Sequence, residues 1–301
     1  MSLDPARLDA ALTTARAALL AERNADGHWE GELSSSALST AVAVAALQHI
    51  QTATGNDYSS YIQGGLQWLA DHANADGGWG DTTKSLSNIS TTTLCWATLH
   101  AVPGAAEQYD DTIEAAEQWL TKAAGGATPE HLAPAIIARY GKDRTFSVPI
   151  LTHCALAGKG DWADVIQLPF ELAALPRKWF AALRLPVVSY ALPALIAIGQ
   201  CRHQHRPTWN PFTRLLRNTA RERTLRVLEQ IQPSNGGFLE ATPLTSFVTM
   251  SLAGCGLADH PVARKGVEFI QSSVRTDGSW PIDTHLATWV TTLSVNALGD
   301  A

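Results

Sequence analysis

Few side chains in this sequence have the types and the spacing that acid–base chemistry needs. Asp110 and Asp111 form the only pair of adjacent carboxylates, and they stand at the start of an expected helix. A helix N-terminus favours ionised carboxylates, so we interpret this pair as structural. Asp283 also stands at an expected helix start, after Pro281 and beside His285, with no second carboxylate nearby in the sequence. A lone aspartate there is typically an N-cap, and Asp283 is at most a weak candidate for a catalytic acid.

Candidate metal ligands gather between residues 201 and 206, where Cys201, His203 and His205 alternate with basic and amide side chains. We expect this stretch to be a loop, and its basic surroundings argue against a bound cation, so no metal is expected. Four scattered cysteines without paired spacing predict buried, reduced thiols: Cys95, Cys154, Cys201 and Cys255. Phosphate-binding glycine loops, a Gly-X-Ser-X-Gly motif and an Asp-Asp-X-X-Asp motif are lacking, and no cofactor is expected.

The elements that must position these residues are helices separated by one recurring turn. The turn occurs at residues 25–29, 75–79, 234–238 and 276–280, and each copy combines an Asp or Asn with a Gly and a following Trp or Phe. Asp, Asn and Gly tolerate the left-handed backbone that ends a helix, and a large aromatic can fix the turn against its neighbours. Apolar spacing predicts helices over residues 8–23, 37–50, 61–73, 91–102, 111–124, 224–231, 245–257, 262–274 and 286–298.

This pattern predicts a helical-repeat fold. Trp29 and Trp79 lie about 50 residues apart, a spacing that suits a unit of two helices with one turn and one return loop. We expect an all-α protein, an α/α toroid of six hairpins in which residues 1–301 form a single domain. The alternative is an open superhelix. Because residues 286–298 are too apolar for an exposed cap, we expect this last helix to close the ring.

Residues 179–199 form the most hydrophobic stretch of the chain, but its uninterrupted apolar part is too short to span a membrane, and Pro186 and Pro193 break its regularity. Basic residues flank it on both sides. One interpretation is an apolar patch that contacts a membrane or a substrate, and the other is a kinked core helix. The residues of the candidate patch are Trp179, Phe180, Tyr190, Leu192 and Leu195.

Charge and composition exclude some functions. The formal net charge is −6, and no basic stripe with interleaved aromatics is present, so nucleic acid is not an expected partner. The N-terminus lacks a basic segment followed by an apolar one, and we expect a cytoplasmic protein that could associate peripherally with a membrane.

The turns resemble the QW repeats of squalene–hopene cyclases and related class II triterpene cyclases. Residues 26–33 resemble the first repeat of that family, and residues 175–193 are similar to its apolar, membrane-facing region. Residues 280–284 and the helix at 285–298 resemble the start of its second, catalytic barrel. The resemblance therefore implies the non-catalytic N-terminal half of an isomerase-type enzyme of isoprenoid biosynthesis, such as hopanoid formation.

Two departures from the family stand out. The family's repeat has a Gln about six residues before the Trp, whereas Arg23, Ala73 and Val274 occupy that position here, and Gln232 precedes a Phe. The family's Asp-X-Asp-Asp-Thr motif, whose acid protonates an alkene, is also lacking. Protein prenyltransferase β-subunits share the toroid, but their Asp, Cys and His zinc ligands are not matched here either.

Three hypotheses about function follow. In the first, the chain is a fragment or one subunit of a split cyclase that acts on an isoprenoid or triterpene, and a second chain carries the catalytic barrel. In the second, it is a non-catalytic isoprenoid- or lipid-binding protein or scaffold, which the lost Gln residues favour modestly. In the third, the single barrel catalyses alone through Asp283, which a shared fold does not by itself support.

Overall fold

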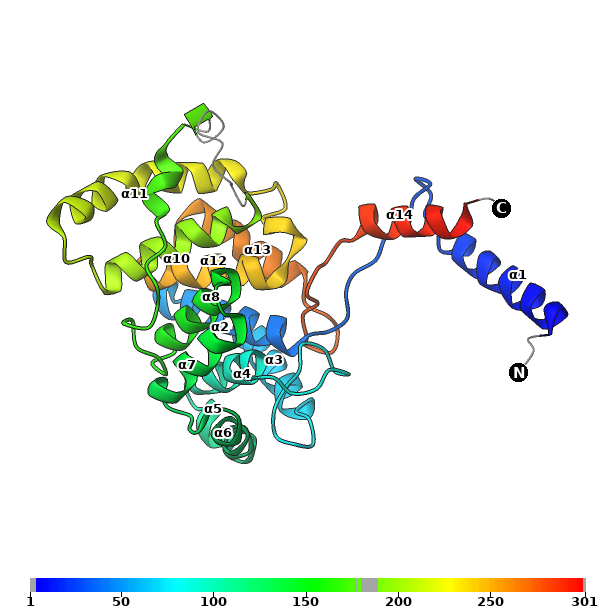
Figure 1. Cartoon of the computed structure of the whole chain (residues 1–301), viewed down its shortest axis with the longest axis horizontal. Coiled ribbons are helices and arrows are strands. Elements are labelled where there is room, and N and C mark those ends of the chain that lie inside the picture. Colours follow the sequence, from blue (N-terminus) through cyan, green and yellow to red (C-terminus); the bar gives the residue numbers. More distant parts are fainter. Residues whose placement is uncertain (1–3, 177, 180–188, 300–301) are drawn as a thin grey trace. The chain divides into compact units, whose positions relative to one another are not determined.

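The computed structural model describes residues 4–176, 178–179 and 189–299. Two compact units are formed: a ring unit of residues 34–282, and a terminal unit of residues 1–33 and 283–301. Figure 1 labels the helices of both units. The ring is therefore built from a narrower range than the 1–301 expected from the sequence.

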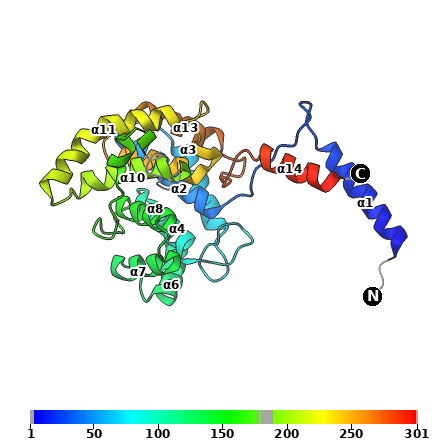
Figure 2. The ribbon, with the colours of Figure 1, turned by 45° about the horizontal axis from the view of Figure 1, so that its top comes forward.

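The ring unit consists of an inner circuit of helices, each covered by an outer helix. In the circuit α2 contacts α4, α4 contacts α8, α8 contacts α10, α10 contacts α12, and α12 contacts α2 again. Among the described residues these five inner helices are α2 (Ala37–Thr54), α4 (Ile89–Ala101), α8 (Arg144–Leu156), α10 (Leu192–His205) and α12 (Thr242–Gly254). Figure 2 shows α2, α4 and α8 between the more peripheral α6, α7 and α11. The expected all-α fold, an α/α toroid, is confirmed, although the described part of the ring has five inner helices and not the six hairpins that were expected.

Each outer helix packs on an inner one. The outer helices are α3 (Ser59–Asp71), α6 (Asp110–Ala124), α7 (Pro129–Tyr140), α11 (Pro211–Ile231) and α13 (Pro261–Ser272). They cover α2, α4, α8, α10 and α12 in that order. Short elements complete the unit: α5 (Ala105–Gln108) and the 3₁₀ turns η1 (Phe170–Ala174), η2 (Ser189–Ala191) and η3 (Phe238–Glu240).

The sequence explains which helices lie inside. Residues 90–99 of α4 and 245–253 of α12 are buried without interruption, and most of α2 is buried as well. Such helices are apolar or small all round, with Ala, Ser and Thr that let neighbouring helices approach. The outer α13 buries one stripe, from Val262 to Ile270, and keeps its charged residues exposed.

Ring closure differs from the sequence expectation. The contact between α2 and α12 closes the circuit, and the last helix does not. That helix, α14 (Ala287–Leu298), lies in the terminal unit together with α1 (Pro5–Ala21). Its apolar composition was the reason to expect a role in closure, yet Ser294 is its one buried residue in the structure.

Candidate functional site

The recurring turns of the ring unit share one set of hydrogen bonds, which we call the clasp. The backbone N–H of the turn aromatic donates to a threonine Oγ1 of an inner helix, over 2.9 to 3.1 Å in the three ring turns. The pairs are Trp79 with Thr92, Phe238 with Thr245, and Trp280 with Thr40. Each Trp also donates its indole N–H to a carbonyl ten residues earlier, so the aromatic joins the end of the outer helix to the inner helix.

The terminal unit contains a fourth clasp with the same geometry. Trp29 donates its backbone N–H to Thr291 Oγ1 over 3.0 Å and its indole N–H to the Leu19 carbonyl over 2.6 Å. This clasp joins the turn after α1 to α14, although α2 is the next helix along the chain. The turn after α13 is correspondingly clasped to α2 through Trp280 and Thr40, and not to α14. Each of these two turns is therefore bonded to a helix that is distant along the chain, and not to the helix that directly follows it in the sequence.

Gln232 performs the bracing expected from the family resemblance. Its Nε2 donates to the carbonyls of Gly236 and Val262, over 3.0 Å in both cases. The side chain therefore links the end of α11 to its own turn and to α13. In the turns where Gln is replaced, the indole donation of the Trp still ties the turn to the preceding helix.

Asp283 lies in the terminal unit, where its carbonyl accepts a hydrogen bond of 3.0 Å from the Leu33 N–H. Its side chain is half-buried, and burial raises the pKa of its carboxyl. A raised pKa keeps the carboxyl protonated at higher pH, but burial alone supplies no strongly acidic proton. The neighbouring His285 is exposed and lies 3.9 Å from Glu30. Asp283 remains a weak sequence-based candidate for a catalytic acid.

The residues of the predicted apolar patch differ in how far they are exposed to solvent. Trp179 and Tyr190 are exposed, with 58% and 57% of their surface accessible, whereas Leu192 and Leu195 are half-buried against the core. Phe180 lies outside the described residues. Among the helices that the structure describes, none has the length and apolar character required to cross a bilayer.

Sequence reasoning missed a second group of exposed apolar side chains near the start of α11. Trp209 is 98% exposed and Phe212 is 83% exposed, and Leu215 and Leu216 are also exposed. The signal was weak because arginines interrupt this stretch and hide any apolar run.

The candidate metal ligands do not form a site. Residues 201–205 belong to α10 and are not the loop expected from the sequence. His203 is hydrogen-bonded to Asn218, and His205 to the Gly254 carbonyl. Within the described ranges, no three His, Cys, Asp or Glu side chains are grouped to hold a metal ion. The four cysteines are free and buried, as expected.

Clasped helical hairpins in a closed circuit define a helical-repeat toroid, and sequence comparison assigns its family. The family described as the Squalene-hopene cyclase N-terminal domain matches residues 12–208, more than half of the chain. The chain therefore belongs to this family, and it contains a terpene cyclase-like domain.

Among solved structures, the chain is similar to one described as the crystal structure of a protein from Actinoplanes, with 16% sequence identity and a TM-score of 0.33. The similarity covers 90% of this chain and 82% of that one. A search of curated proteins found no match.

Proposed function

We propose that this chain is one part of a class II-type isoprenoid cyclase and that a second polypeptide completes a catalytic ring on its terminal unit. One observation carries the proposal. Every ring turn that contains a Trp or Phe clasp packs against the next outer helix, whereas the described part of the terminal unit contains only the helices α1 and α14 and has no further outer helix to cover its turn.

The three ring turns set the pattern. A Cβ atom added to Gly77 would lie 2.7 Å from the Ala115 carbonyl of α6, and one added to Gly278 would lie 2.7 Å from the Gly64 carbonyl of α3. At Gly236 the nearest atom is the Lys265 carbonyl of α13. The outer helix is therefore in contact with the turn at all three sites.

The neighbouring outer helix also reaches the turn carboxylate. Trp119 of α6 donates its indole N–H to Asp76 over 3.0 Å, and Trp68 of α3 donates to Asp277 over 3.1 Å. In the terminal unit the equivalent Asp26 is exposed, and no described residue of that unit other than the immediate chain neighbours lies within 4 Å of a Cβ built on Gly27. This difference supports a partner helix that would cover residues 26–29 and offer a donor to Asp26.

The helices of the terminal unit also present apolar side chains. Half or more of the surface of each of these side chains is exposed: Leu8, Leu12 and Leu20 on α1, and Trp289, Leu293 and Val295 on α14. In the ring unit, most comparable side chains of the inner and outer helices are buried against neighbouring hairpins, and the main exposed apolar group on an outer helix is the one at the start of α11. A second polypeptide of helical hairpins fits these faces, because apolar burial is the main favourable term in such association.

The chemistry of the reaction also supports a second polypeptide that supplies the catalytic acid. Class II cyclisation begins with protonation of an alkene, which needs a strong acid held protonated. The chain lacks the family's acid motif, and Asp283 has a pKa raised by burial alone. In this proposal the second polypeptide supplies the acid, the ring unit supports the barrel, and the substrate is an isoprenoid or triterpene. Trp179 and Tyr190 would contribute peripheral membrane contact.

Co-purification tests the proposal. The chain is co-expressed with a polypeptide that carries the Asp-X-Asp-Asp-Thr motif and is encoded next to it. We expect a stoichiometric complex that converts squalene or a related isoprenoid to cyclic products, detected by mass spectrometry. Leu293→Asp on α14 should abolish both complex and product. The matched control is Leu86→Asp, because Leu86 is an exposed leucine of the ring unit.

Three results would contradict the proposal: an intact complex with Leu293→Asp, equal loss with Leu86→Asp, or no acid-motif polypeptide in the genome of origin. Specific retention of an isoprenoid by the chain alone, without conversion, would instead favour the non-catalytic binding protein. That alternative has one observation on its side, which is the loss of Gln from three of the four turns.

A further inference from the structure

A cavity of about 360 Å³ opens between α10 and α11, next to η1. Its lining includes Arg214, Arg217 and Arg221 of α11, and His203 of α10. The volume falls within the range of small-ligand pockets. We propose that this cavity binds the phosphate group of a phosphate ester or of diphosphate. The inference is separate from the proposed cyclase function, because it concerns another part of the molecule and needs no second polypeptide.

The three arginines line one side of α11. Their spacing of three and four residues puts them on one face of a helix, so that their guanidinium groups can converge on a single ligand. Guanidinium groups donate in a fixed fork that matches phosphate oxygens, which is why arginine is common at phosphate sites. This spacing therefore favours an anion with several oxygens.

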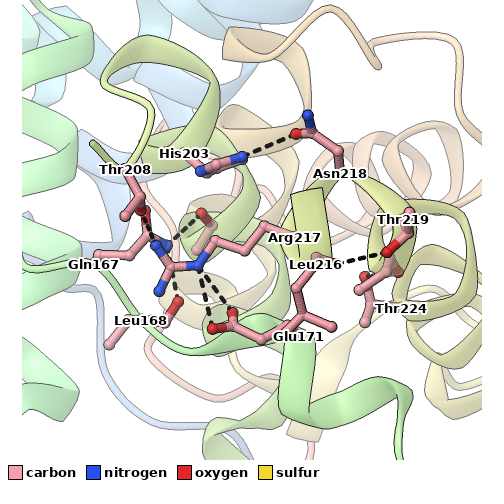
Figure 3. Close-up of polar contacts among 12 residues, drawn as sticks. Gln167, Leu168, Glu171, His203, Thr208, Leu216, Arg217, Asn218, Thr219 and Thr224 are labelled. Atoms are coloured by element: carbon pink, nitrogen blue, oxygen red, sulfur yellow. Dashed lines mark hydrogen bonds and ion pairs between the residues drawn. The ribbon is translucent and has the colours of Figure 1, made fainter. Parts of the chain in front are cut away.

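Arg217 is the anchored member of the group. Figure 3 shows its Nε directed at both carboxylate oxygens of Glu171, each at 3.2 Å, and another guanidinium nitrogen bonded to Thr208. The two charged side chains of this pair are each only 10% exposed. A buried ion pair of this kind is costly to break, so Arg217 is fixed and its charge is balanced by Glu171.

Arg214 and Arg221 supply the charge available to a ligand. Arg214 is exposed and Arg221 half-buried, and neither forms an ion pair with any residue that the structure describes. Arg221 donates a long hydrogen bond of 3.4 Å to the Cys255 carbonyl, which leaves its other N–H groups available. The cavity thus has two arginine charges without a carboxylate partner.

Buried polar atoms complete the lining. His203 is 8% exposed, and its Nε2 lies 3.0 Å from Asn218 Oδ1. Its Nδ1 has no hydrogen-bond partner among the described residues, and the same is true of Oε1 of the buried Gln200. Unpaired buried polar atoms cost free energy, and ligands or ordered water usually satisfy them. Both atoms accept hydrogen bonds, because an amide oxygen cannot donate and His203 donates through Nε2 to Asn218. Ordered water or a hydroxyl group suits them, and the arginines provide the donors for phosphate oxygens.

The surroundings suggest two sources for the phosphate. Trp209 and Phe212, at the loop and first turn that lead into the arginine face, are almost fully exposed. Aromatic side chains flanked by arginine suit the interface of an anionic membrane, where a lipid headgroup would provide the phosphate. A free phosphate or diphosphate offers the same oxygen chemistry, and the experiment separates the two.

The test compares two double variants of the full chain. Arg214→Gln with Arg221→Gln removes the two available charges of the cavity, and Arg223→Gln with Arg226→Gln removes the same net charge from exposed positions of α11 outside it. Arg217 is left intact, because its loss would leave Glu171 buried without a partner. Circular dichroism melting curves establish that both variants fold.

Binding of sodium diphosphate is measured by titration calorimetry at fixed ionic strength. Binding to vesicles is measured by flotation with phosphatidylglycerol, and with phosphatidylcholine for comparison. We expect the cavity variant to bind about tenfold or more weakly, as loss of charge-assisted hydrogen bonds requires, and the control variant to stay within about twofold of the parent.

Saturable diphosphate binding assigns a free phosphate ligand, and binding to phosphatidylglycerol vesicles alone assigns a lipid headgroup. Equal weakening in both variants would show a general effect of net charge and overturn the proposal. The absence of binding to either probe would also overturn it.

Discussion

Replacing Thr40 with valine should lower the free energy of unfolding of the ring by about 1–3 kcal/mol. Thr40 Oγ1 accepts the Trp280 N–H over 3.1 Å, and neither residue is exposed to solvent. Valine has nearly the same shape, so no cavity forms, but the buried N–H loses its acceptor and pays its full desolvation cost. This bond joins segments 240 residues apart, so the effect reports on ring closure.

Urea unfolding followed by tryptophan fluorescence measures the change. For a domain of this size, about 1 kcal/mol corresponds to a shift of about 2–4 °C in the melting temperature, which gives a second measurement. The matched control is Thr291→Val, which removes the equivalent acceptor for Trp29 in the terminal unit. We expect it to leave the unfolding of the ring unchanged within about 0.5 kcal/mol. A Thr40→Val protein as stable as the parent would refute the role of this clasp in ring closure.

Two further predictions concern the ring. Gly236→Ala should cost at least about 1 kcal/mol more than Gly55→Ala in urea unfolding, because both glycines have positive φ but only Gly236 faces a neighbouring carbonyl; equal costs would contradict this packing. Stability should also fall as pH drops from about 6.5 towards 4, because burial lowers the pKa of His49 to about 4, and burial with the nearby His49 lowers that of His153 to about 3. In this pH range the unfolded chain binds protons that the folded chain does not. The free energy of unfolding therefore falls by up to about 1.4 kcal/mol per pH unit for each histidine. Urea unfolding at pH 6.5 and 5.0 measures the slope, which His153→Gln should reduce, and a flat profile would be contrary to this account.

The class of fold could be predicted from the sequence because the signals for its turns and helices lie within short segments of the chain. Each turn combines a glycine, a polar residue and an aromatic within five positions, and the structure confirms these turns between helices. The predicted start of a helix was wrong where charged residues interrupt the apolar spacing. Residues 211–223 of α11 are rich in arginine, so the helix was expected to begin at Thr224 instead of Pro211.

Ring closure and the candidate cavity depend on pairs that no local pattern reveals. The backbone N–H of Trp280 donates to Thr40 of α2, which lies 240 residues away in the sequence. Thr291, which is nearer in the sequence, accepts from Trp29 instead. Arg217 and Glu171 are similarly separated by 46 residues. Several buried threonines could have served each turn, and the choice among them is made by packing of the whole ring.

The most direct test of the account is a comparison of squalene turnover by the purified chain with turnover after addition of the acid-motif polypeptide, with products identified by mass spectrometry. We predict no cyclic product from the chain alone and polycyclic product from the mixture. A polycyclic product formed by the chain alone, and lost in Asp283→Asn, would contradict the claim that a second polypeptide supplies the acid.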